Sequence, residues 1–171
     1  MPTDQKDQLD EHQFLDRMVA EAVWGMQHED PLHYSQDAAK RWAWRQGDVH
    51  DHCKLPTWMD CSSFGTYCIW RACAGDPKFD PSGSNGFHWG NSTSIYNYAK
   101  AHNRLVPMDE AKRGYLVVWP GKHVSILIAG PRHLGLKAAV ASHGSESGPY
   151  KLDVEDELSL GKPNFVKTWV E

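Results

Sequence analysis

Three residues of this chain have the types and the order of a thiol-dependent catalytic site: Cys61, His123 and His143. Cys61 follows Asp60 and precedes an apolar run that begins at Phe64, so it is expected in the first turn of a helix with Asp60 as N-cap. Free backbone N–H groups and the helix dipole favour a thiolate over a thiol at such a position. A cysteine at a helix start, followed by two histidines in strand-like runs, predicts a thiol hydrolase.

The two histidines have the sequence context of a base and of the group that orients it. His123 opens an alternating run in which every second residue from Val124 to Ile128 shares one face, so His123 is expected on the other face, toward a cleft. His143 closes the next strand-like run and, if the two strands are neighbours, can hydrogen-bond His123 and fix its tautomer. Glu146 is the alternative third residue, because a carboxylate can do the same work.

The elements that must position these residues are helix-like in the first part of the chain and strand-like in the second. Helices are expected over residues 11–26, 36–45, 61–73 and 93–102, with Ser35 and Ser92 as the caps of the second and fourth. Strands are expected over residues 115–119, 123–129, 138–143 and 165–170. This order predicts the α+β class, with N-terminal helices packed on a C-terminal antiparallel sheet. Residues 1–10 are expected to be a flexible N-terminus and residues 11–171 a single domain.

Composition and charge exclude several classes of protein. The net charge of −4, from 18 basic and 22 acidic residues, provides no basic field, so no nucleic-acid partner is expected. No run approaches the ~20 apolar residues of a membrane span, so no membrane insertion is expected. The polar N-terminus lacks the apolar stretch of a signal peptide. The four cysteines include no C-x-x-C pair and are expected to be reduced thiols of a cytosolic protein, with Cys68 and Cys73 in structural positions.

The eight tryptophans are unusual for a chain of 171 residues, and several stand among polar residues. That context suits a groove that receives a sugar–peptide polymer, with Trp58, Phe87 and Trp89 as candidate walls. Ordinary anchoring of loops is an equal alternative for these three side chains. Residues 40–45 mix basic and aromatic types, which favours helix packing with cations that extend to solvent.

Four segments together resemble the NlpC-type branch of the papain-like cell-wall cysteine peptidases, and most closely the catalytic domains of actinobacteriophage endolysins. They are Asp60-Cys61-Ser62-Ser63-Phe64, Gly114-Tyr115-Leu116-Val117-Val118, His123-Val124-Ser125-Ile126 and Ser142-His143-Gly144-Ser145-Glu146-Ser147-Gly148-Pro149. The upstream segment His33-Tyr34-Ser35-Gln36, with Arg41-Trp42, is also similar to that group. The resemblance spans residues 30–170, nearly the whole chain.

The resemblance implies a papain-like fold and gives each matching residue a role. Cys61 is then the nucleophile, His123 the base and His143 the orienting third residue, while Tyr34 lines the oxyanion site with the backbone N–H of Cys61. It implies a bacteriophage peptidoglycan hydrolase that cleaves an amide bond of the stem peptide, without metal or other cofactor, as a monomer. The protein is then expected in the host cytoplasm until holin-type release to the cell wall. One departure is Gly114-Tyr115, where the family usually has Gly-Asp, which bears on the geometry of that turn.

Three alternatives remain open at the level of sequence. A metal-dependent amidase could use His50, His52 and Cys53, although zinc sites usually have better-separated ligand pairs. A cell-wall-binding module could retain the same cysteine as a relict. An acyltransferase could pass the acyl group to an amine, because the motif does not distinguish water from an amine as acceptor.

Overall fold

The computed structural model describes residues 9–28, 33–46, 56, 58–73, 91–129, 139–144, 150–155 and 160–169. At residues 45–46, 143–144 and 150–155 it describes the backbone alone. Helices lie mostly in the first part of this chain and the larger sheet in the second, so the expected α+β class with an antiparallel sheet is confirmed.

The larger sheet has six strands in the order β3-β8-β4-β5-β6-β7, and all neighbouring strands are antiparallel. Its strands are β3 (Leu105–Val106), β4 (Leu116–Trp119), β5 (His123–Leu127), β6 (Ala139–Gly144), β7 (Tyr150–Glu155) and β8 (Asn164–Val166). A separate pair of short parallel strands comprises β1 (His33–Tyr34) and β2 (Trp58–Met59). The helices are α1 (Glu11–Gln27), α2 (Ala38–Arg41), α3 (Cys61–Ala72) and α4 (Ser92–Ala101), with short 3-10 turns at Ala43–Gln46 and Met108–Glu110.

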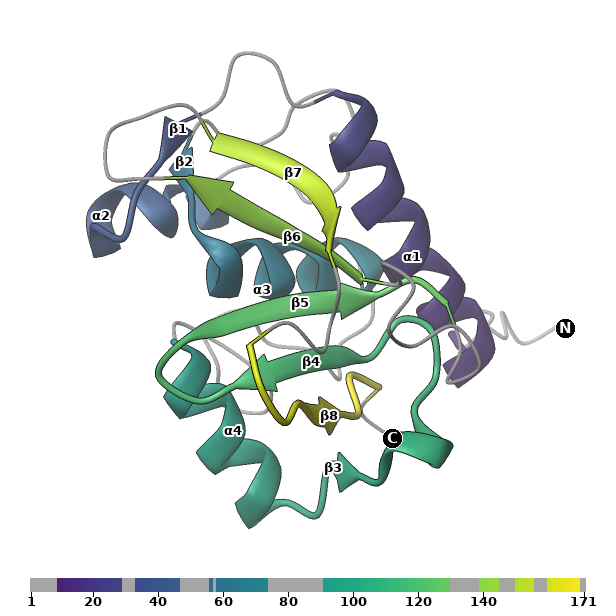
Figure 1. The fold of residues 1–171 in the computed structure, drawn as a ribbon. Helices are drawn as coiled ribbons and strands as arrows, with labels where there is room; N and C mark the ends of the chain where they lie inside the picture. The colour runs from purple at the N-terminus through teal and green to yellow at the C-terminus, as the bar shows by residue number, and fades with distance from the viewer. Residues whose placement is uncertain are drawn as a thin grey trace, which may run out of the picture.

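Helix α3 is the central helix of the fold. In Figure 1 it runs behind β5 and β6 with α1 beside it, and both of these strands and α1 contact it. Every residue from Ser62 to Ala72 is buried, so this helix has no solvent-facing stripe. Asp60 is its N-cap in a capping box: the carboxylate accepts from the N–H of Ser63, whose hydroxyl accepts from the N–H of Asp60. The predicted helix start at Cys61 and its Asp60 cap are confirmed.

Helix α1 confirms the amphipathic helix that the sequence predicts. Asp10 caps it in a capping box with Gln13, and Leu9 packs against the core, so residues 9 and 10, which were expected to be flexible, belong to the packed structure. Its buried side chains recur at helical spacing, and the helix packs on α3 and on strands of the larger sheet. These side chains are Phe14, Leu15, Met18, Val19 and Ala22.

Two predicted caps are wrong, because an equally suitable acceptor nearby caps each helix instead. Helix α2 is capped by Asp37, whose carboxylate accepts from the N–H of Lys40, while the Ser35 hydroxyl accepts from the N–H of Asp37. Helix α4 is capped by Asn91, whose side chain accepts from the N–H of Ser94. Ser92 is instead the first residue of α4 and is buried.

The sheet is buried on both faces at β5, which corrects the expectation that His123 and Ser125 face an open cleft. His123 is 8% exposed and Ser125 1%. A second apolar cluster covers the face of the sheet opposite α3; its buried members are Ala111, Val117, Trp119, Leu127 and Phe165. The strand prediction also missed β7 and the short strands β1, β2 and β3.

The turn before β4 is intact despite its departure from the Gly-Asp pattern. Gly114 has a φ of 90°, a value that favours glycine, and its N–H donates to the carbonyl of Leu127 at 2.6 Å. Its own carbonyl accepts from the Thr168 hydroxyl at 2.8 Å. Tyr115 is 1% exposed, so it begins the buried run that continues into β4.

Candidate active site

Cys61 is the first residue of α3, and its sulfur lies against the start of β5. The backbone N–H of Val124 hydrogen-bonds the sulfur, and the N–H groups of Ser62 and Cys61 itself also point at it. Because Val124 directly follows His123, the fold brings the predicted nucleophile to the strand position beside the predicted base. Cys61 and His123 are separated by 61 residues in the chain, and the packing of α3 on β5 brings these two segments together.

The electrostatics of Cys61 differ from the sequence expectation of a ready thiolate. Burial, and after it the negative charge of Asp60, raise the pKa of the Cys61 thiol to about 11. The N–H groups of Val124, Ser62 and Cys61 lower this pKa, so the effect expected of a helix start is present but is outweighed. At pH 7 the thiol is therefore protonated in all but about one molecule in ten thousand.

The two histidines lie at the same end of neighbouring antiparallel strands. His123 is the first residue of β5, and its ring stacks on Trp119 with centroids 5.9 Å apart. His143 lies near the end of β6, which pairs with β5 at Ile126↔Val140 and Leu127↔Ala139. Figure 1 shows β5 and β6 diverging toward the end that carries both histidines. The side chain of His143 lies outside the described part, so its bond to His123 stays a prediction.

Tyr34 is brought to the segment that leads into Cys61. Strands β1 and β2 are parallel with Tyr34 opposite Met59, and the N–H of Ser35 donates to the Met59 carbonyl at 3.2 Å. Tyr34 is partly buried against the core, and its hydroxyl accepts from Gln36 Nε2 at 3.4 Å. Its predicted role at the oxyanion stays a prediction.

Trp58 offers a partly exposed aromatic surface just before the cysteine segment. Its ring lies 4.9 Å from that of His33, and the Lys40 ammonium lies 4.4 Å from its centroid. Such a surface combines an apolar face with a cation. The other candidate groove residues, Phe87 and Trp89, lie outside the described residues.

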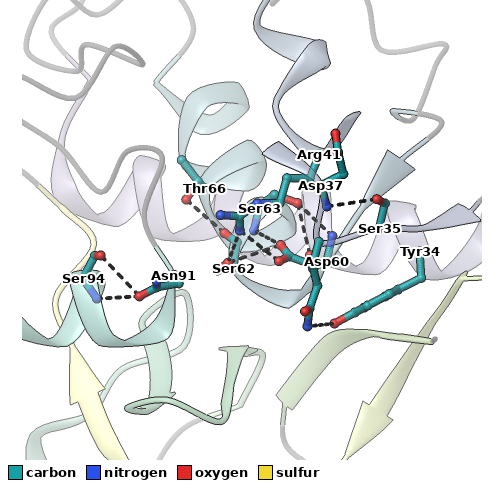
Figure 2. A network of polar contacts seen from close by, with 11 residues as sticks. Tyr34, Ser35, Asp37, Arg41, Asp60, Ser62, Ser63, Thr66, Asn91 and Ser94 are labelled. Carbon is teal, nitrogen blue, oxygen red and sulfur yellow. Dashed lines mark hydrogen bonds and ion pairs between the residues drawn. The ribbon is translucent and has the colours of Figure 1, made fainter. Parts of the chain in front are cut away.

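A buried polar network surrounds the start of α3 (Figure 2). Arg41 Nη1 lies 2.9 Å from Asp60 Oδ2 and 3.1 Å from Ser62 Oγ, and Ser62 Oγ donates to Asp60 Oδ1 at 3.2 Å. The pattern of residues 40–45 predicts helix packing with cations that extend to solvent, whereas the guanidinium of Arg41 is turned to the start of α3. Sequence alone offered no signal that would pair Arg41 with Asp60.

No metal site is found in the part of the chain that the structure describes: no group of three histidine, cysteine or acidic residues there could hold an ion. The residues of the metal alternative, His50, His52 and Cys53, lie outside that part, as does Glu146. Cys68 and Cys73 are buried free cysteines, which confirms their structural placement. Among the described residues, no helix is long and apolar enough to cross a membrane.

Comparisons with protein-family models, with curated proteins and with solved structures found no match for this chain. The chemistry of this protein is therefore inferred from the residues around Cys61. That arrangement holds a thiol at a helix start, donors that point at the sulfur, and an imidazole at the adjacent strand position, which are the parts needed for acyl transfer to and from sulfur.

Proposed function

We propose that this protein is a cysteine peptidase or amidase of the papain-like NlpC type that cleaves an amide bond in the stem peptide of bacterial peptidoglycan. One observation carries the proposal: the sulfur of Cys61 accepts the N–H of Val124, the residue that follows His123. A cysteine with only a packing role needs no helix start and no convergent N–H groups. The peptidoglycan substrate is inferred from the resemblance of the motifs and from the aromatic surface at Trp58.

The chemistry of the first step follows from the raised pKa of Cys61. Because the resting thiol is protonated, His123 acts as general base and removes the S–H proton as the sulfur attacks the scissile carbonyl. A carbon–sulfur bond forms, and the negative charge on the carbonyl oxygen is stabilised by N–H groups at the start of α3. The protonated His123 then gives its proton to the leaving amine, and the carbon–nitrogen bond breaks to leave an acyl-enzyme.

The second step reverses the roles of the same groups. His123 removes a proton from water, the hydroxyl oxygen attacks the thioester carbon, and the carbon–sulfur bond breaks with return of a proton to Cys61. In this proposal His143 orients the ring of His123, and Tyr34 contributes to the oxyanion site. No metal or organic cofactor takes part. The protein then acts as an endolysin-type enzyme that reaches the wall after release from the host cytoplasm.

A second candidate is a cell-wall-binding module with an unreactive cysteine. The observation in its favour is the thiol pKa of about 11, since catalytic cysteines are usually acidic. In that case Trp58 and its neighbours bind glycan or peptide, and the Cys61 sulfur is a buried relict.

Digestion of purified peptidoglycan, with the products resolved by mass, tests the proposal. We expect fragments that carry one new amine and one new carboxyl end, formed at the same rate with and without EDTA. Fragments that disappear with EDTA would favour the metal-dependent alternative. Retention of the protein on sacculi without any fragments, on several wall types, would favour the binding module.

A further inference from the structure

Arg41 joins the two residues that flank the candidate nucleophile. Its Nη1 atom donates to Asp60 Oδ2 at 2.9 Å and to Ser62 Oγ at 3.1 Å (Figure 2). These two residues precede and follow Cys61 in the chain. The side chains of Arg41 and Asp60 are 12% and 8% exposed, so this ion pair is largely removed from water. Arg41 belongs to α2, an element that the proposed chemistry does not otherwise use.

The contacts of Asp60 explain why its fixed position matters. Its Oδ1 atom accepts from the N–H of Ser63 at 2.9 Å and from the Ser62 hydroxyl at 3.2 Å, and its Oδ2 atom is held by Arg41. The capped first turn carries the N–H groups of Cys61 and Ser62, which point at the sulfur. Asp60 thus orders the donors around the thiol, but its negative charge also disfavours the thiolate.

A buried ion pair of this kind is weak evidence for stability alone, because desolvation of two charges offsets their attraction. The position of the Arg41–Asp60 ion pair next to Cys61 lets it act on the charge of the sulfur. The guanidinium opposes the charge of the carboxylate at the place where a sulfur anion must form, and it does so without removing the cap.

We propose that Arg41 is a positioning residue for Cys61, which holds the Asp60 and Ser62 side chains and offsets the Asp60 charge so that the sulfur can become an anion. This inference rests on the proposed function in that it takes Cys61 as the nucleophile. Among the described residues, the titratable groups near this end of the fold include His123 at the start of β5, Tyr34 and His33 on β1, and Lys40 beside Trp58. The variants below leave these groups, and His143, in place.

The test is the rate at which iodoacetamide alkylates Cys61 between pH 8 and 10, followed by peptide mass so that Cys61 is distinguished from the other cysteines. Arg41→Met keeps the length of the side chain and removes its charge. We expect alkylation at least about threefold slower than in the wild type at each pH, which corresponds to half a pKa unit. Arg41→Gln carries the same expectation and serves if the methionine variant does not fold. Arg41→Lys retains the charge and should restore most of the rate.

The matched control is Arg71→Met, which removes the other buried arginine–carboxylate pair of α3, at the opposite end of the helix. Arg71 Nη2 lies 3.5 Å from Glu21 Oε1, and the Arg71 side chain is 1% exposed. This variant should lose stability but leave the Cys61 alkylation rate within about twofold, because charge effects on a pKa need proximity. A general loosening of the fold would change the Cys61 alkylation rate of Arg41→Met and of Arg71→Met alike.

A double variant separates charge from geometry. In an Asp60→Asn background the carboxylate is absent while asparagine can still cap α3, so Arg41→Met should slow alkylation by less than about twofold. Equal or faster alkylation in both Arg41→Met and Arg41→Gln, or an undiminished effect in the Asp60→Asn background, would overturn the inference. These readouts do not need peptidoglycan cleavage. Failure of the proposed function would show instead as absence of fragments from the wild type.

Discussion

Gly65 sets how closely α3 can approach the sheet, and its replacement by valine is the perturbation we develop first. Gly65 lies four residues after Cys61, on the same face of the helix. A Cβ atom built there would lie 3.3 Å from Leu116 Cδ2 and 3.5 Å from Val124 Cγ1, so the helix contacts β4 and β5 at their side chains. Val124 is the same residue whose N–H meets the Cys61 sulfur.

The magnitude follows from the contacts. Gly65→Ala adds only the Cβ atom, and its tight contact is with the end of the Leu116 side chain. The helix-propensity gain of about 1 kcal/mol offsets this contact, so little net change in the free energy of unfolding is expected. Gly65→Val places further methyl groups against Leu116 and Val124, and overpacking costs about 1–3 kcal/mol. We expect α3 to move away from β5, which would carry Cys61 away from the Val124 N–H and from His123.

The assay compares urea unfolding with the rate of peptidoglycan cleavage. A protein that loses about 2 kcal/mol from a total of about 5–15 kcal/mol remains almost entirely folded, so cleavage should not fall through unfolding. A displacement of about 1 Å at a reacting group costs about 100-fold in rate, and we expect a loss of that order for Gly65→Val. Wild-type cleavage by the valine variant would refute the argument that close approach of α3 to β5 sets the site.

Three further predictions concern pH and the turn before β4. Because burial and the Asp60 charge raise the pKa of Cys61 to about 11, alkylation of Cys61 should accelerate about tenfold per pH unit from pH 7 to 10; a plateau near pH 7 would instead indicate a preformed thiolate. Gly114→Ala should lower the free energy of unfolding in urea by about 2–4 kcal/mol, since φ is 90° and the new Cβ would lie 3.0 Å from a backbone oxygen of α1; a loss below about 0.5 kcal/mol would contradict this. Burial and Glu11 raise the pKa of Tyr115 to about 12, so the folded state keeps the phenol proton at a pH where the unfolded state releases it. The contribution of Tyr115 to the free energy of unfolding should therefore be fully present below about pH 9 and should fall as the pH rises toward 12. Tyr115→Phe should flatten that fall above pH 10, as measured by urea midpoints, and an unchanged slope would contradict the assignment.

The parts of the fold that local signals determine could be predicted from the sequence. Asp60 before an apolar run gave the start of α3, and the helical spacing from Phe14 onward gave α1. Caps were less certain, because Ser35 and Asp37 both suit a helix start and sequence alone does not choose between them. The structure uses Asp37, whose carboxylate reaches the N–H of Lys40.

Strand β7 was missed although its sequence carries a strand signal. In Tyr150–Glu155, Tyr, Leu and Val alternate with Lys, Asp and Glu, which is the pattern of a half-buried strand. It pairs with the whole of β6, from Ala139↔Glu155 to Gly144↔Tyr150. The very short strands β1 and β2 had no such pattern, because two residues define no period.

In the candidate site, too, the features that depend on local sequence could be predicted, and those that depend on contacts between distant segments could not. The position of Cys61 at the start of its helix depends on local signals, and this prediction is confirmed. Its thiol pKa depends on how much of α3 the sheet and α1 cover, which no segment encodes alone. The pairing of Arg41 with Asp60 joins two residues that are 19 positions apart in the chain, so only the fold reveals that the two charges meet.

The central claim is that Cys61 forms the acyl-enzyme with His123 as its base. The most direct test is the rate of peptidoglycan cleavage by Cys61→Ala and by His123→Ala, each compared with the wild type at matched binding to sacculi. The account predicts that cleavage falls at least about 1,000-fold in Cys61→Ala and about 100-fold or more in His123→Ala, with sacculus binding retained. Cleavage by Cys61→Ala at the wild-type rate would contradict the account.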